Sequence, residues 1–156
     1  MYIMTVFISA TDARTRWADV FSRAVQERWP VPIERGGDEH GLLIGFDELG
    51  LLLDRYDFEP EAFFEADTVS LWLPELALYG RGASFEAAQA DLVDEVRIYV
   101  EEYLADARLY LRAPNRAEHF PYVLRAFVAD AAGRLADVLF APPAASLVAP
   151  EPVAAA

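Results

Sequence analysis

Five apolar residues between positions 17 and 25 recur at the spacing of an α-helix. They are Trp17, Val20, Phe21, Ala24 and Val25. Residues spaced i, i+3, i+4, i+7 and i+8 lie on one wide face of a helix, and that face must be covered by another element or another chain. The sequence therefore predicts an amphipathic helix that ends at Trp29-Pro30 and whose Trp17 and Phe21 belong to the core of a domain or of a dimer.

A strand is predicted before this helix and a hairpin after it. Residues 1–8 are apolar and β-branched, as in a short strand, and Ser9 or Thr11 is expected to cap the helix, with Asp12 in its first turn. The hairpin consists of a strand over residues 31–35, a turn at 36–38 and a strand over 41–46. A second helix is predicted over residues 47–56.

Three short motifs accompany this order of elements: Ile8-Ser9-x-Thr11-x-Ala13-Arg14, Pro32-Ile33-x-Arg35-Gly36 and Phe46-Asp47-x-Leu49. Together with the order of elements, these motifs resemble the Phd/YefM family of antitoxins. The resemblance covers residues 1–56. It implies a domain that forms a homodimer, binds operator DNA and represses its own operon together with a toxin.

The resemblance also implies which residues contact DNA. An arginine at the start of the first helix and another after the first hairpin strand approach DNA in that family, and they correspond here to Arg14 and Arg35. The expected phosphate contacts are Ser9, Thr11 and Arg16. Asp38 and Glu39 lie just beyond Arg35 in the sequence, and like-signed charges weaken binding to phosphate, so the contact at Arg14 is expected to be the stronger one. The alternative is that these arginines lie on a solvated helix face.

The charge is divided unevenly along the chain. Up to residue 35, five arginines stand against four acids, a net charge of +1, whereas the remainder has eight arginines against 22 acids, a net charge of −14. A weakly basic segment joined to a strongly acidic one suggests two different partners.

The middle of the chain predicts a hairpin followed by a long helix. Residues 68–74 alternate apolar and other side chains, as in a strand covered on one face, and residues 76–79 are expected to return beside it before Gly80-Arg81-Gly82. Ser84 is a suitable cap for the helix that follows. The expected buried stripe of that helix is Phe85, Ala88, Leu92, Val96, Tyr99 or Val100, and Tyr103. Its expected polar side carries Asp91, Asp94, Glu95, Glu101 and Glu102.

This region resembles HicB antitoxins in Leu73-Pro74-Glu75-Leu76, Gly82-Ala83-Ser84-Phe85-Glu86-Ala87 and Tyr103-Leu104. The upstream strands of the HicB sheet are not evident, unless the first hairpin or residues 57–67 supply one. The resemblance implies a toxin-facing module over residues 57–140. Its expected contact surface consists of Trp72, Asp91, Asp94, Glu95, Glu101 and Glu102. An acidic cover of this kind suits a small basic ribonuclease-type toxin, RelE- or HicA-like.

The last third predicts one further helix and a tail. Residues 113–115 break the chain and residues 120–140 are expected to form a helix, although Gly133 lies inside it. The expected buried residues of that helix are Val123 or Leu124, Phe127, Val128, Ala131, Leu135, Val138 and Leu139. His119 is expected to serve as a cap or a hydrogen-bond partner. Residues 141–156, rich in proline and alanine, are expected to form a flexible tail.

These observations predict an α+β chain: a strand-helix-hairpin-helix domain, a hairpin with a long helix, and a C-terminal helix. Cysteine is absent and no apolar run is long enough to span a membrane, so we expect a cytoplasmic protein without disulfides. No Gly-rich phosphate loop or metal-ligand spacing is present, and we expect no cofactor and no bound metal.

Three hypotheses of function remain. The first is an antitoxin of a bacterial type II toxin-antitoxin system that binds its toxin and represses its operon, and is not an enzyme. The second is an acidic dimeric protein-interaction module that does not bind DNA. The third, and least favoured, is a metal-dependent nuclease using Asp94 and Glu95, because hydrolytic metal sites need acids from several elements and these lie along one helix.

Overall fold

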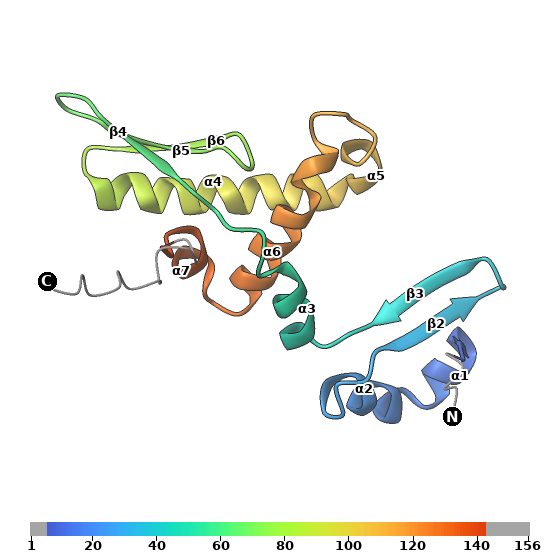
Figure 1. The fold of residues 1–156 in the computed structure, drawn as a ribbon. Coiled ribbons are helices and arrows are strands. Elements are labelled where there is room, and N and C mark those ends of the chain that lie inside the picture. Colours follow the sequence, from blue (N-terminus) through green and yellow to red (C-terminus); the bar gives the residue numbers. More distant parts are fainter. Residues whose placement is uncertain (1–5, 143–156) are drawn as a thin grey trace, which may run out of the picture. The chain divides into compact units, whose positions relative to one another are not determined.

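The computed structural model describes residues 6–142 and divides the chain into two compact units, residues 1–52 and 53–156 (Figure 1). The fold is α+β, as predicted. Unit 1 contains β1 (Ile8–Ser9), α1 (Ala10–Thr15), α2 (Trp17–Val25), β2 (Val31–Arg35), β3 (Glu39–Leu43) and α3 (Phe46–Leu53), whose last residue belongs to unit 2. Unit 2 then contains β4 (Glu61–Phe64), β5 (Val69–Leu73), β6 (Leu78–Gly82), α4 (Phe85–Ala105), α5 (Ala107–Tyr110), a 3₁₀ turn η1 (Ala117–His119), α6 (Phe120–Ala131) and α7 (Leu135–Leu139).

The sheet of unit 1 has the order β1-β2-β3, with β1 parallel and β3 antiparallel to β2. The predicted strand over residues 31–35 is confirmed. Its partner begins at Glu39 rather than Gly41, because Gly36 and Gly37 both adopt positive φ, +65° and +86°, and reverse the chain so tightly that Arg35 pairs directly with Glu39. The second helix covers Phe46–Leu53 rather than residues 47–56.

The predicted first helix is two helices. Ser9 is the N-cap of α1, where its Oγ accepts a hydrogen bond of 3.0 Å from the N–H of Asp12. The helical path breaks at Arg16, whose φ and ψ are −113° and 34°. α2 then ends at Val25, before Pro30, because Arg28 adopts a positive φ of 56° and the N–H of Trp29 bonds to the carbonyl of Arg23.

The core of unit 1 is small. Its buried members are Ala13, Val20, Ala24 and Val31. The prediction that Trp17 and Phe21 belong to the core of the domain is wrong within a single chain, because their side chains are 51% and 47% exposed. The wide apolar face of α2 is divided into two rows. Val20 and Ala24 pack into the core, whereas Trp17, Phe21 and Val25, at positions i, i+4 and i+8, are exposed to solvent.

The sheet of unit 2 is an antiparallel meander of order β4-β5-β6, and α4 runs along one of its faces (Figure 1). The alternation predicted for residues 68–74 is confirmed, because Val69, Leu71 and Leu73 are buried and the two residues between them are only partly so. Residues 57–67, which had been one of two possible sources of an upstream strand, supply β4. The predicted cap is also confirmed, since Ser84 Oγ accepts from the N–H of Ala87 at 3.1 Å.

β6 continues through the glycines that had been predicted to follow it. A Cβ atom placed on Gly80 would lie 2.5 Å from the carbonyl oxygen of Ala88 and from the Cβ of Leu92. One on Gly82 would lie 2.5 Å from the Cβ of Ala87. These glycines are therefore strand residues that let the backbone of α4 approach β6 closely.

The core of unit 2 is larger. It joins the buried face of the sheet to α4, α6 and α7, and its α4 members are Ala88, Leu92, Val93, Val96, Tyr99, Val100 and Tyr103. The prediction of burial is wrong for three residues of this unit: Phe85 is 39% exposed, Phe127 is 46% exposed, and Ala131 is exposed as well. The predicted helix over residues 120–140 is divided at Gly133, which adopts a φ of +70° and separates α6 from α7. The predicted tail lies outside the described residues from position 143.

Two arginines, Arg116 and Arg125, form hydrogen bonds that hold the irregular segments of unit 2 in place. The N–H groups of Arg125 reach the carbonyl oxygens of Asp54 and Tyr56 and the carboxylate of Asp57, which holds residues 54–57 against α6. Arg116 donates to the hydroxyl of Tyr99, which lies 2.6 Å from Nδ1 of His119. His119 is thus a hydrogen-bond partner, as predicted, and burial together with Arg116 lowers its pKa below the ordinary value.

Candidate functional site

The arginines of the first helices are exposed and carry no ion pair with any described residue. Arg14 lies in the last turn of α1, and Arg16 lies at the break before α2. Arg23 lies over the ring of Trp29, 5.2 Å from its centroid. Of the predicted phosphate contacts, Thr11 is exposed, whereas the Oγ of Ser9 is engaged as the helix cap. The beginning of unit 1 therefore presents cationic side chains to solvent.

Arg35 differs from these arginines because it has a partner. Its Nε donates to Oε2 of Glu39, the residue directly opposite in the hairpin, and this hydrogen bond raises the pKa of Arg35. The charge of Arg35 is therefore partly neutralised within the hairpin by Glu39, one of the acids that follow it in the sequence. Pairing across the turn could be anticipated only from the register of the strands.

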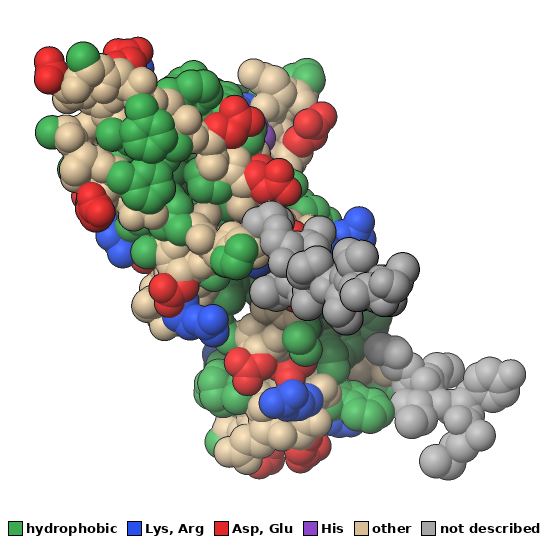
Figure 2. All heavy atoms as spheres, turned by 60° about the vertical axis from the view of Figure 1, so that its left-hand side comes forward, with side chains coloured by type: hydrophobic (Ala, Val, Ile, Leu, Met, Phe, Trp, Pro, Cys, Tyr) green, Lys and Arg blue, Asp and Glu red, His purple; other side chains and the backbone are tan. Residues whose placement is uncertain are grey.

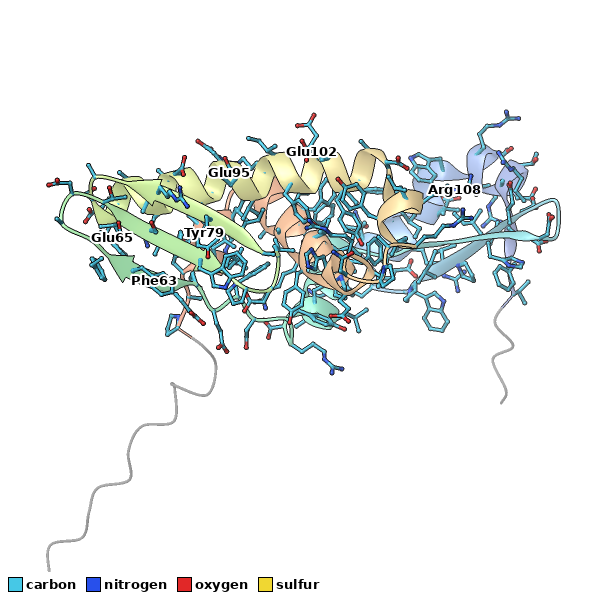
Figure 3. The ribbon with its side chains drawn as sticks, turned by 90° about the horizontal axis from the view of Figure 1, so that it is seen from above. Phe63, Glu65, Tyr79, Glu95, Glu102 and Arg108 are labelled. Carbon is cyan, nitrogen blue, oxygen red and sulfur yellow. The ribbon has the colours of Figure 1, made fainter. Side chains whose placement is uncertain are left out.

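The five acids of α4 that were predicted to bind the toxin are exposed, but two of them are used within the chain. Asp91 accepts a hydrogen bond of 2.7 Å from the backbone N–H of Arg81 in β6. Asp94 lies 3.2 Å from Arg97, which also bonds to Asp130 of α6 at 3.0 Å. The acids of this row that form neither an ion pair nor a side-chain hydrogen bond with any described residue are Glu95, Glu101 and Glu102. Figure 3 shows Glu95 and Glu102 on the flank of α4 that points away from β4.

Trp72 lies on the other side of the sheet from α4. Its ring and that of Tyr79 are 4.4 Å apart, and the guanidinium of Arg81 lies 5.7 Å from the Tyr79 centroid. Strand register places Phe63, which is half exposed, on the same face. The predicted toxin-binding residues therefore fall on two surfaces: Trp72 on the outer face of the sheet, and the acids on α4.

We name the surface formed by Phe63, Trp72, Tyr79 and Arg81 the aromatic face. Phe63 had no role in the sequence-based prediction, and Tyr79 was expected only as part of a returning strand. The side chains of β5 alternate between the two faces of the sheet, and residues paired across neighbouring strands share a face. Because Phe63 pairs with Ser70 and Tyr79 pairs with Trp72, both lie on the same face as Trp72.

No metal site is formed by residues 6–142: nowhere among them do three His, Asp or Glu side chains converge so that they could hold an ion. Asp94 and Glu95, the residues of the nuclease hypothesis, lie on one helix, and Asp94 is paired with Arg97. In the same part of the chain, none of the helices combines the length and the apolar character needed to cross a membrane.

Two comparisons with known proteins find matches. A family model described as "Antitoxin of toxin-antitoxin, RelE / RelB, TA system" matches residues 4–140. A crystal structure from Syntrophomonas wolfei subsp. wolfei, described as the antitoxin part of a proposed toxin/antitoxin system, shares the fold with a TM-score of 0.71. It is 21% identical, and the match covers 85% of this chain and 95% of that one. No curated protein matches the sequence significantly. Because the family model spans most of the sequence, this chain belongs to the antitoxin family of toxin-antitoxin systems.

Proposed function

We propose that this antitoxin neutralises a small, basic, ribonuclease-type toxin, RelE- or HicA-like, by binding it through unit 2. We also propose that unit 1 forms a homodimer of the Phd/YefM type, which represses the operon by binding operator DNA. The observation that carries the first part is the row of exposed, unpaired acids Glu95, Glu101 and Glu102. Unit 2 as a whole has eight arginines against 18 acids, a net charge of −10.

Electrostatics explain why such a surface suits such a toxin. An enzyme that cuts RNA must hold phosphates on a cationic surface, and a row of carboxylates resembles that charge pattern. Carboxylates already paired within the chain, as Asp94 is with Arg97, offer less attraction than unpaired ones. We therefore assign the main electrostatic role to Glu95, Glu101 and Glu102, and a smaller one to Asp91 and Asp94.

Growth of bacteria that express the small open reading frame neighbouring this gene tests neutralisation. We expect growth arrest, relief of the arrest by co-expression of this chain, and loss of relief with the triple variant Glu95→Lys, Glu101→Lys and Glu102→Lys. Three interfacial charges worth about 1 kcal/mol each correspond to an affinity about 100-fold weaker.

A matched control separates position from total charge. The variant Asp106→Lys, Glu118→Lys and Asp137→Lys makes the same change in charge at exposed positions of unit 2 outside the row, and should still relieve the arrest. Arrest that the unaltered chain fails to relieve would contradict neutralisation and favour the acidic interaction module.

Operator binding is proposed to depend on Arg14 and Arg16, with Arg35 and Thr11 contributing less and Ser9 only through its cap. We expect the full chain to bind its own promoter in a salt-dependent manner. Replacing both Arg14 and Arg16 by alanine should weaken binding and reduce the slope of log K against log salt by about one for each phosphate that is no longer neutralised.

Fluorescence anisotropy with promoter DNA at several salt concentrations measures this. The control replaces Arg108 and Arg112, two exposed arginines of unit 2, by alanine, and should leave the slope unchanged. Absent or salt-insensitive binding by the unaltered chain would contradict repression by direct contact and leave unit 1 as a dimerisation domain, the second hypothesis.

A further inference from the structure

The two edges of the sheet in unit 2 differ in how their backbone groups are used. At the hairpin that joins β4 to β5, the N–H of Glu65 bonds to the carbonyl of Thr68 at 2.9 Å, so these residues form a hydrogen-bonded pair. Bonded and non-bonded pairs alternate along an antiparallel ladder. Phe63 is therefore bonded to Ser70, whereas Ala62 and Phe64 direct their N–H and C=O groups away from β5.

The same alternation turns the N–H of Arg81 toward the free side of β6. There Asp91 of α4 accepts it at 2.7 Å, so a side chain of this chain occupies that edge. No described residue hydrogen-bonds the outward groups of Ala62 and Phe64 in this way. All four residues of β4 are exposed, with Phe63 at 50% and Phe64 at 70%. An unprotected edge strand with exposed aromatic side chains is a template for another strand.

The surroundings of β4 determine which strand fits. Residues 57–67 contain five acids and no arginine or lysine. One candidate is β4 of a second copy, paired antiparallel so that the outward groups of Ala62 bond to those of Phe64. This register would place Glu61 directly opposite Glu65. Like charges at opposite positions destabilise a sheet, and this pairing would repeat the conflict at both ends.

We infer that the edge of β4 binds an extended, basic strand of the toxin, which extends the sheet by one strand. This inference rests on the proposed neutralisation of a basic toxin by unit 2. The outward groups of Ala62 and Phe64 would supply backbone hydrogen bonds, and Glu61 and Glu65 would pair with cationic side chains of the added strand.

The two faces of the sheet explain how apolar residues of that strand would be received. On one side, Phe63 is the member of the aromatic face that lies on β4 itself. On the other, Phe64 stacks on Phe85 of α4, with ring centroids 6.4 Å apart. In Figure 2, hydrophobic side chains gather on the part of unit 2 that faces the viewer, with acidic side chains at the margin. Alternate residues of an added strand would meet one aromatic cluster on each side.

Amide hydrogen exchange tests this with the full chain and the purified product of the neighbouring open reading frame. In the free chain, the N–H groups of Ala62 and Phe64 should exchange rapidly and that of Phe63 slowly, because only the last is bonded to β5. In the complex, Ala62 and Phe64 should become protected. Phe63 is the internal control, since its hydrogen bond to Ser70 exists in both states.

A variant pair provides an independent measurement. Ala62→Pro removes an outward N–H without removing a bond to β5. It should weaken toxin binding about tenfold, because one or two hydrogen bonds to the added strand would be lost. Ala62→Val keeps the N–H and should change binding less than about threefold. Circular dichroism of the free variants checks that the sheet is intact.

The outcomes separate this inference from the function on which it rests. Binding with protection of Ala62 and Phe64 supports it. Binding without that protection overturns the strand addition and leaves toxin binding standing. Protection that appears in the free chain as its concentration rises, together with a larger particle, overturns it in favour of a second copy. Absence of binding overturns the proposed neutralisation together with this inference.

Discussion

Replacing Gly80 by valine is expected to lower the free energy of unfolding of unit 2 by about 3 kcal/mol or more, because overpacking at a rigid contact cannot be relieved by rotation of a side chain. The new Cβ would lie 2.5 Å from the carbonyl oxygen of Ala88 and the N of Leu92, both backbone atoms of α4. The helix would have to move off the sheet, and the core that joins them would open.

Urea denaturation followed by circular dichroism measures this effect, since α4 is the longest helix among the described elements. Gly80→Ala gives a graded change if the valine variant does not fold, because it introduces the same Cβ without the two methyl groups. Gly41→Ala is the control, as nothing lies within 4 Å of a Cβ at that strand position. Similar midpoints for Gly80→Ala and Gly41→Ala would show that β6 and α4 do not require this close approach.

Replacing Trp17 and Phe21 together by alanine is expected to convert the proposed dimer into monomers. These two rings lie outside the core of unit 1, which has four buried residues, and they are about half exposed. Their centroids are 5.9 Å apart, and they form a row on α2 with the exposed Val25. Buried aromatic residues at an interface often contribute about 2 kcal/mol or more each, so losing both should weaken dimerisation by about 1,000-fold or more.

Sedimentation equilibrium over a range of concentrations measures the dissociation constant. The control replaces Phe85 and Phe127, two exposed aromatic residues of unit 2, by alanine, and should leave it unchanged. A double variant of Trp17 and Phe21 that dimerises as well as the unaltered chain would place the dimer contact elsewhere. An unaltered chain that stays monomeric would remove dimerisation from the proposed function.

Local features of unit 2 were predictable from the sequence because they depend on neighbouring residues. The alternation of Val69, Leu71 and Leu73 identified β5, and Ser84 identified the start of α4 through a hydrogen bond that reaches only three residues. The stripe of α4 was correct except at its first position, Phe85. A helical stripe shows which residues share a face, but not how far the neighbouring sheet extends over it.

The α+β class, the order of most elements and the antitoxin family were determined by the sequence itself, through periodicity, caps, turn residues and short motifs. Only the tertiary structure decided which half of the apolar face of α2 is buried, and that Gly80 and Gly82 serve close packing rather than a turn. It also decided which carboxylates are engaged within the chain: Asp91 accepts from the backbone N–H of Arg81 across 10 residues of sequence, and Asp130 pairs with Arg97 across 33. The physical reason is that such partners are set by strand register and helix packing, whereas helix periods and caps are set within a few residues.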